Sequence, residues 1–141
     1  MNLNRYLPSH IDPSQVVARV GLVSDTHMPE RCAELPPSFF EVLDGVDLLL
    51  HAGDVGELWV LERLSAIAPV IAVHGNDTTP EAQRALPYSQ VVTVAGQRIF
   101  LWHSHLPEWE DEMNSRRSDE LRPKLARTVD AAHSHGASIA I

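Results

Sequence analysis

The chain has 141 residues, of which 44% are apolar and 21% are charged, and its formal net charge is −8. This length suits one globular domain, and the acidic charge disfavours nucleic acid or an anionic membrane surface as the main partner. The single Cys32 excludes an internal disulfide framework and fits a reducing compartment. No apolar stretch approaches the roughly 18 residues of a membrane span, and the polar N-terminus lacks a signal peptide's apolar core, so we expect a cytoplasmic location.

The first half of the chain predicts alternating strands and helices. Residues 1–15 contain Pro8 and Pro13 and are predicted to form an N-terminal extension, with the domain over residues 16–141. Three apolar runs are typical of buried parallel strands, and they cover residues 17–23, 46–50 and 70–73. Two helices are predicted between them, one over residues 39–43 that Ser38 would cap and one over residues 57–67. This order favours a parallel sheet with right-handed crossovers.

The second half predicts a hairpin and a further helix. Residues 80–86 are predicted to form a single helical turn, and two strands joined by a tight turn are predicted over residues 91–94 and 99–102. The highly charged residues 108–118 are expected to be a mobile loop or a cap. A helix over residues 119–135 is interrupted or restarted at Pro123 and ends at Gly136. Residues 138–141 begin another β-like run.

Four of the predicted strands are followed at once by residue types that bind metals. In order of strand, these residues are Asp25 with His27, Asp54, Asn76, and His103. Gly53 and Gly75 precede two of them and permit tight turns. Because neighbouring strands lie about 4.8 Å apart, such side chains can converge at the edge of a sheet. Oxygen and imidazole donors suit Mn, Mg, Fe, Ni or Zn, and so large a set suits two ions about 3.5–4 Å apart.

These motifs resemble those of the calcineurin-like metallophosphoesterases. The closest resemblance is to the small single-domain phosphodiesterase branch, which includes the retromer scaffold subunit. It rests on Asp25-Thr-His27, Gly53-Asp54, Gly75-Asn76 and His103-Ser-His105, in this order, and runs from about Arg19 to the C-terminus. The resemblance implies an α/β fold in which a two-sheet β-sandwich is flanked by helices, with a dimetal site at the strand ends.

The resemblance also implies a role for each of these residues. Asp25 and His27 would bind the first of two divalent cations, Asp54 would bridge both, and Asn76 and His103 would bind the second. Mn is the metal we expect first. The implied reaction is hydrolysis of a small phosphate ester, a diester or a monoester, by a hydroxide that the ions share. The expected catalytic residues are Asp54, Asn76, Asp77 and His103.

Two features depart from the family pattern. The family has a further Gly-His-x-His after the next strand, and this sequence ends at Ile141 before it. We therefore expect a domain that lacks its last strands, as a truncated fragment would. His133 and His135 do not replace this motif, because positions i and i+2 of a helix point about 200° apart. Asp77 stands where the family places its general acid, which leaves the acid of this chain in doubt.

Several residues and functions stay open at this point. His51, His74 and His105 are expected to support the ligands rather than to bind metal, and Arg116 or Arg117 is a candidate to reach a substrate phosphate. The alternative to an enzyme is a catalytically weak or inactive scaffold of the same fold that binds a protein partner. A nucleotide-binding Rossmann domain is disfavoured because no Gly-rich loop follows the first strand. Homo-oligomerisation stays open.

Overall fold

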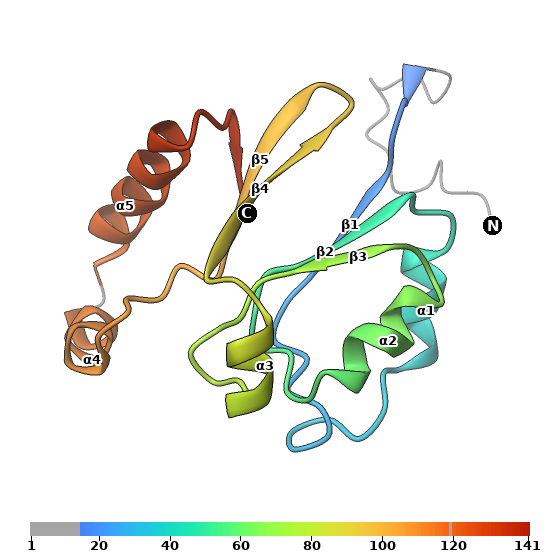
Figure 1. Ribbon diagram of the computed structural model, residues 1–141, viewed down its shortest axis with the longest axis horizontal. Coiled ribbons are helices and arrows are strands. Elements are labelled where there is room, and N and C mark those ends of the chain that lie inside the picture. Colours follow the sequence, from blue (N-terminus) through green and yellow to red (C-terminus); the bar gives the residue numbers. More distant parts are fainter. Residues whose placement is uncertain (1–14, 119) are drawn as a thin grey trace.

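The computed structural model describes residues 15–118 and 120–141, so the predicted N-terminal extension lies outside the described residues except for Gln15. Figure 1 shows the helices and strands along the chain. Their order is β1 (Val20–Val23), α1 (Pro37–Leu43), β2 (Leu48–His51), α2 (Trp59–Ser65), β3 (Val70–Ala72), α3 (Pro80–Ala85), β4 (Ser89–Val94), β5 (Gln97–Trp102), α4 (Trp109–Ser118), α5 (Leu121–Ser134) and β6 (Ile139–Ala140).

The strands of the described residues form two sheets that helices flank on their outer faces (Figure 1). The first sheet has the order β1-β2-β3 and is parallel throughout. The second has the order β4-β5-β6, with β4 antiparallel and β6 parallel to β5. Helices α1 and α2 cover the first sheet and α5 lies beside the second. The predicted two-sheet α/β sandwich is confirmed.

Side chains that alternate along β2 and β5 hold these layers together. In β2, Leu49 packs toward α1 and α2, whereas Leu50 packs into the core between the two sheets. In β5, Ile99 contributes to that same inter-sheet core, whereas Phe100 packs toward α5. Successive residues of a strand point to opposite faces, so strands buried on both sides need continuous apolar runs. This is why the runs in the sequence are unbroken.

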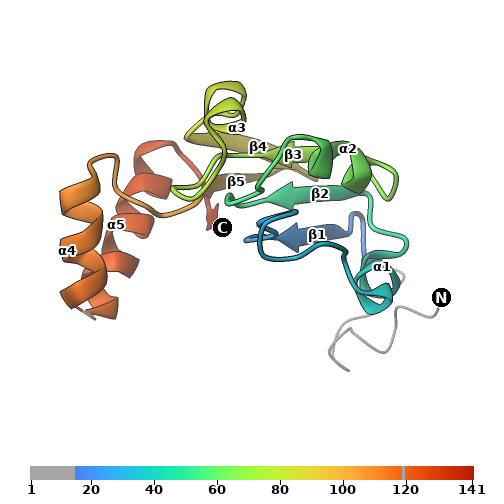
Figure 2. The ribbon, with the colours of Figure 1, turned by 90° about the horizontal axis from the view of Figure 1, so that it is seen from below.

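The three parallel strands end level with one another. Val23 of β1 pairs with His51 of β2, which in turn pairs with Ala72 of β3. Figure 2 shows β1 and β2 side by side with their arrowheads at the same edge of the sheet. The loops that follow the strands, residues 24–27, 52–55 and 73–77, therefore leave from one edge. This register positions the side chains of the candidate site.

The predicted helices differ from the structure mainly at their ends. Helix α1 begins at Pro37, with Pro36 at the N-cap position, so the prediction that Ser38 caps it is wrong. Proline is well suited to this first turn because the N–H that it lacks has no partner within the helix. Strand β1 begins at Val20 rather than at residue 17, and α2 is shorter than the predicted 57–67.

The region after β5 was predicted least well. Residues 109–118, expected to be a loop or a cap, form helix α4. Helix α5 runs without a break through Pro123, which lies in its first turn, where the ring does not interrupt a hydrogen bond. Gly136 follows α5 with φ +64°, as a glycine that ends a helix does. Among the described residues, no helix has the length and apolar character needed to cross a membrane.

Candidate metal centre

The loops after β1 and β2 are joined by backbone hydrogen bonds. The N–H of Asp25 donates to the carbonyl oxygen of Gly53 at 3.0 Å, and the N–H of His27 donates to that of Asp54, also at 3.0 Å. The ladder of the sheet thus continues past the strand ends. It fixes the two loops that carry the first three ligand-type residues.

These three residues share an unusual backbone conformation. Asp25, His27 and Asp54 have φ values of +57°, +44° and +52°, in the left-handed region that residues other than glycine rarely adopt. Each costs about 1 kcal/mol relative to an ordinary backbone conformation. Such strain persists only where the surrounding structure imposes it, and it concentrates at functional sites. Here it turns three polar side chains toward one point.

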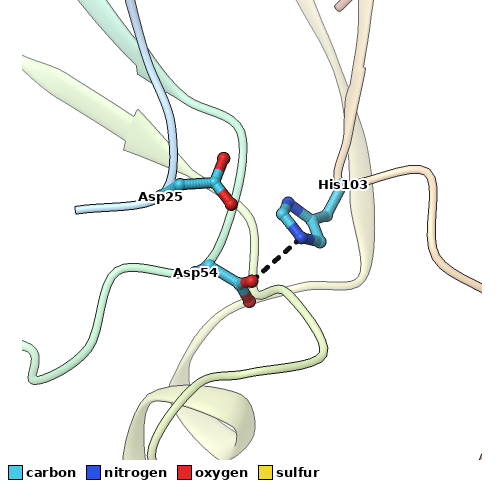
Figure 3. A group of neighbouring side chains, drawn as sticks. All are labelled: Asp25, Asp54 and His103. Atoms are coloured by element: carbon cyan, nitrogen blue, oxygen red, sulfur yellow. Dashed lines mark ion pairs between the residues drawn. The ribbon is translucent and has the colours of Figure 1, made fainter. Parts of the chain in front are cut away.

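The side chains meet at the edge of the sandwich. Figure 3 shows Asp25, Asp54 and His103 pointing toward one another from the ends of β1, β2 and β5. The Nε2 atom of His103 lies 3.2 Å from Oδ2 of Asp54. That of His27 lies 3.7 Å from the same oxygen and 3.6 Å from Oδ1 of Asp25. Because β5 belongs to the second sheet, the approach of His103 depends on packing between the sheets as well as on strand spacing.

Two groups of donor atoms share Asp54. Donor atoms of Asp25, Asp54 and His103 lie within 4.8 Å of one another, and so do those of His27, Asp54 and Asp77. The family resemblance implied that Asp25 and His27 bind the same cation. In the structure, Asp25 instead falls in the group with His103, and His27 in the group with Asp77. The two groups therefore have one buried carboxylate in common, that of Asp54.

Asn76 lies on the loop after β3, between Gly75 and Asp77, both of which contact Asp54. Its side-chain Oδ1 is buried and has no hydrogen-bond partner within the described residues. A buried carbonyl oxygen without a partner is costly, and a cation is one group that would satisfy it. Gly75 lets this loop lie against Asp54, because a Cβ atom there would lie 1.9 Å from Oδ1 of Asp54.

His103 is oriented for metal binding by its other nitrogen. Its Nδ1 lies 2.6 Å from the carbonyl oxygen of Ala52, which can only accept, so Nδ1 carries a proton and Nε2 is the nitrogen that faces the cluster, where it would offer a lone pair to a cation after losing its own proton. Metal-binding histidines are commonly held in this way. Together with the free oxygen of Asn76, this orientation shows that the residues present fit divalent cations.

In the metal-free protein, Asp54 and His103 shift each other's pKa values. Burial raises the pKa of the Asp54 carboxyl, but the hydrogen bonds from His103 and from the Asp77 N–H outweigh burial, so the net pKa is lowered. Burial lowers the pKa of His103, but the hydrogen bond to Asp54 and the carbonyl of Ala52 outweigh it, so the net pKa is raised. Each of the two side chains thus favours the charged form of the other in the metal-free protein.

His51 lies beneath the cluster in a closed chain of hydrogen bonds. The N–H of Gly53 donates to its Nδ1, and its Nε2 lies 3.1 Å from the hydroxyl of Thr26, which itself donates to the carbonyl of Val55. This pattern needs the neutral imidazole with its proton on Nε2. Burial lowers the pKa of His51 to about 4, although the charge of Asp25 opposes this. His51 therefore joins the two loops without contributing a charge.

His74 and His105 lie to one side, in an aromatic cluster with Tyr88. The ring of His105 lies 5.5 Å from that of His74 and 4.7 Å from that of Tyr88, whose hydroxyl donates to the carbonyl of His105. Burial, with the charges of His103 and His74, lowers the pKa of His105 to about 4. The ring of His105 also lies 5.7 Å from that of His103, and neither His74 nor His105 belongs to the donor groups found among the described residues.

The structure also brings in Arg31, which the sequence analysis missed. Its guanidinium forms an ion pair with Asp77, and its Nη1 lies 3.5 Å from Nε2 of His27. The carboxylate of Asp77 also lies 3.7 Å from Nδ1 of His27. The one available signal was that Arg31 is four residues after His27 in the same loop. Arg116, one of the two sequence candidates for phosphate binding, is instead paired with Glu112 at 2.7 Å.

Comparisons with known proteins found a matching family and similar relatives. The family model described as the calcineurin-like phosphoesterase superfamily domain matches residues 19–140. A probable metallophosphoesterase of Methanothermobacter thermautotrophicus is 44% identical over 87 residues, which are 62% of this chain and 50% of that protein. The chain thus spans about half the length of this relative.

Solved structures of Vps29 share the fold. Vacuolar Protein Sorting 29 from Cryptosporidium parvum superposes with a TM-score of 0.62 at 25% identity, over 86% of this chain and 61% of that one. Vps29 from Chaetomium thermophilum superposes with a TM-score of 0.61 at 21% identity, over 86% and 58%, respectively. The latter likeness concerns the fold alone.

Proposed function

This chain belongs to the calcineurin-like phosphoesterase superfamily, and we propose that it hydrolyses a phosphate ester, preferentially a diester, with two divalent cations. The observation that carries the proposal is the pair of donor groups that share Asp54. The residues proposed to hold the cations are Asp25, His27, Asp54, Asn76 and His103. Mn²⁺ is the metal we propose first, since carboxylate, amide and imidazole donors suit it.

Each of these residues contributes through its own chemistry. The buried carboxylate of Asp54 faces both groups and would offset the charge of both cations. Asn76 adds an oxygen donor without further negative charge, and the Ala52 carbonyl holds the ring of His103 with its Nε2 toward the cluster. When bound, the cations would supply positive charge that polarises the phosphoryl group and activates water.

The contacts of Asp77 favour orientation over proton donation. Its carboxylate accepts from Arg31 and lies beside Nδ1 of His27, while its backbone N–H donates to Oδ1 of Asp54 at 2.8 Å. A carboxylate next to the outer nitrogen of a metal-binding histidine is a common supporting group. We therefore propose that Asp77 orients His27 and Asp54, in place of the leaving-group acid expected from its position.

Metal binding and turnover test the proposal. The full chain, stripped with EDTA, is titrated with Mn²⁺ by calorimetry and then assayed with bis-p-nitrophenyl phosphate and with p-nitrophenyl phosphate. We expect up to two Mn²⁺ per chain and hydrolysis that depends on Mn²⁺, faster for the diester. Failure to bind Mn²⁺, or hydrolysis that EDTA leaves unchanged, would overturn it.

A second candidate function is a scaffold that binds a protein partner. The similarity to Vps29 supports it, and so does an apolar cavity of about 320 Å³ beside β1 and α1, where Leu22 and Val42 are exposed. The same experiment separates the two candidates. Mn²⁺ binding without turnover of either ester favours the scaffold. The cytoplasmic location and the oligomeric state stay predictions.

A further inference from the structure

We propose that Arg31 binds the non-bridging oxygens of the substrate's phosphate group at the mouth of the metal centre, and that Asp77 holds its guanidinium when no phosphate is present. This inference rests on the proposed function and adds to it a residue that recognises phosphate. It is argued from the position of Arg31, its charge and its present partner.

Arg31 lies at the end of a turn that backbone hydrogen bonds hold in place. Its backbone N–H donates to the carbonyl oxygen of His27 at 2.9 Å, which closes the turn. Within the turn, Met28 is completely buried, its N–H donates to Val55, and its carbonyl accepts from Glu57. The base of the Arg31 side chain is therefore positioned by the same loop contacts that position His27.

The guanidinium of Arg31 lies beside His27 and Asp77, two members of one donor group. Nη1 of Arg31 lies 3.5 Å from Nε2 of His27, the nitrogen that faces Asp25 and Asp54. The Arg31 side chain is 59% exposed, so a ligand that enters from solvent can reach it. A phosphate whose oxygens approach the cations would thus meet the guanidinium at the same time.

The site is acidic, so the positive charge of Arg31 would favour the binding of an anion there. The chain carries a net charge of −8, and the site itself contains the carboxylates of Asp25, Asp54 and Asp77. Among the ion pairs between described residues, the one that joins an arginine to the site is that of Arg31 with Asp77. A guanidinium can donate two parallel hydrogen bonds to one phosphoryl group, which gives orientation as well as attraction.

The present partner of Arg31 can be exchanged for phosphate. Asp77 is 46% exposed and Arg31 is more exposed still, and exposed ion pairs of this kind contribute little to stability. Asp77 keeps its backbone hydrogen bond to Asp54 whatever Arg31 does. The guanidinium can therefore move from Asp77 to a phosphate oxygen without disturbing the loop.

The test is the affinity of the full chain for inorganic phosphate, measured by calorimetry with and without saturating Mn²⁺. In Arg31→Gln we expect phosphate affinity to fall at least tenfold, with Mn²⁺ affinity unchanged or slightly tighter. Arg31→Lys should fall between wild type and Arg31→Gln, because an ammonium lacks the planar fork. Arg63→Gln, at an exposed arginine of α2, is the matched control and should bind phosphate as the wild type does.

The outcomes separate this inference from the proposed function. Equal phosphate affinity in the wild type and in Arg31→Gln would overturn the role of Arg31, whereas failure of the wild type to bind Mn²⁺ would overturn the metal centre. Asp77→Asn removes the competing carboxylate and, measured without Mn²⁺ so that the metal centre does not contribute, should bind phosphate more tightly than the wild type. Unchanged or weaker binding in that variant would show that Asp77 does not compete for Arg31.

Discussion

Gly75 and Asp54 are in direct contact, and no larger residue fits at position 75. A Cβ atom there would lie 1.9 Å from Oδ1 of Asp54 and 2.6 Å from its backbone nitrogen. The lack of a side chain lets the loop after β3 close on the loop after β2. The N–H of Asp77 can then donate to the carboxylate at 2.8 Å.

The first prediction is that Gly75→Ala displaces the Asp54 carboxylate. The added methyl group forces the two loops apart, which should cost about 1–3 kcal/mol of unfolding free energy, as overpacking does. Mn²⁺ affinity should fall by more than about tenfold, the lower limit typical of damage to groups that support a metal site. Urea denaturation and calorimetric titration with Mn²⁺ measure the two effects.

Gly96→Ala is the control for this substitution. A Cβ atom at Gly96 meets nothing within 4 Å, but the φ of +78° there makes alanine strained. That variant should lose about 1 kcal/mol of stability and keep its Mn²⁺ affinity. Equal Mn²⁺ affinity in Gly75→Ala and Gly96→Ala would contradict the steric argument.

The second prediction concerns Asp54 as the shared ligand. Asp54→Asn keeps an oxygen that can accept from the Asp77 N–H but loses the negative charge that faces both donor groups. Mn²⁺ should therefore be lost from both groups together, with affinity reduced by more than about 100-fold, beyond the range typical of supporting residues. Asp130→Asn, at an exposed position of α5, should titrate like the wild type. Retention of two Mn²⁺ ions by Asp54→Asn would rule out the shared role.

The third prediction is a loss of stability in acid that depends on His51. The pKa of His51 is about 4 in the folded protein and about 6.5 in an unfolded chain. Between these values the unfolded state binds more protons, so the stability present above pH 6.5 is lost as the pH falls toward 4. A shift of this size corresponds to about 3 kcal/mol.

Urea denaturation at pH 7, 6 and 5 in the presence of EDTA measures this dependence. His51→Gln keeps a donor for Thr26 but does not titrate, so its stability should fall less steeply with pH than that of the wild type. His133→Gln, at an exposed histidine of α5, should follow the wild type. If His51→Gln and the wild type had the same slope, His51 would not be the group responsible.

The fourth prediction assigns a local role to Glu112. The carboxylate of this buried residue of α4 accepts from the N–H of Leu106 at 2.9 Å and from Arg116. Burial raises the pKa of Glu112, but these two donors outweigh burial, so the net pKa is lowered. Helix α4 thereby holds the loop that carries His103 and His105.

Glu112→Gln should destabilise the protein by about 1–2 kcal/mol, since hydrogen bonds to a charged group are weakened. It should also accelerate hydrogen exchange at the Leu106 amide, which mass spectrometry of peptides from this loop can follow. Glu110→Gln, in the same turn of α4 but exposed, should leave the exchange unchanged. Slow exchange at Leu106 in both variants would argue against the role of Glu112.

The sequence indicated the strands and the cluster because both follow from local patterns. Unbroken apolar runs predict strands buried on both faces, and parallel strands in register end at one edge. Asp25 and Asp54 could therefore be expected to lie close together. His103 was expected there from the same strand-end pattern and from the resemblance, but its position depends on how the second sheet packs on the first, which no local pattern contains.

What the sequence did not indicate depends on contacts between distant residues. Arg31 and Asp77 are 46 residues apart, and their ion pair exists because two loops leave the same edge of the sheet. Helix α4 has only Trp109 and Met113 as large apolar residues, too few to give a helical period. Its buried contact with the loop is made by a glutamate, the residue type least expected in that position.

The left-handed backbone at Asp25, His27 and Asp54 has a consequence for how such a protein responds to selection. Glycine adopts this conformation without strain, so glycine at any of the three positions would relieve strain while removing a donor atom. A library of variants selected for heat resistance alone should therefore accumulate glycine at these positions and lose its affinity for Mn²⁺. Only selection that includes metal binding should keep the two aspartates and the histidine.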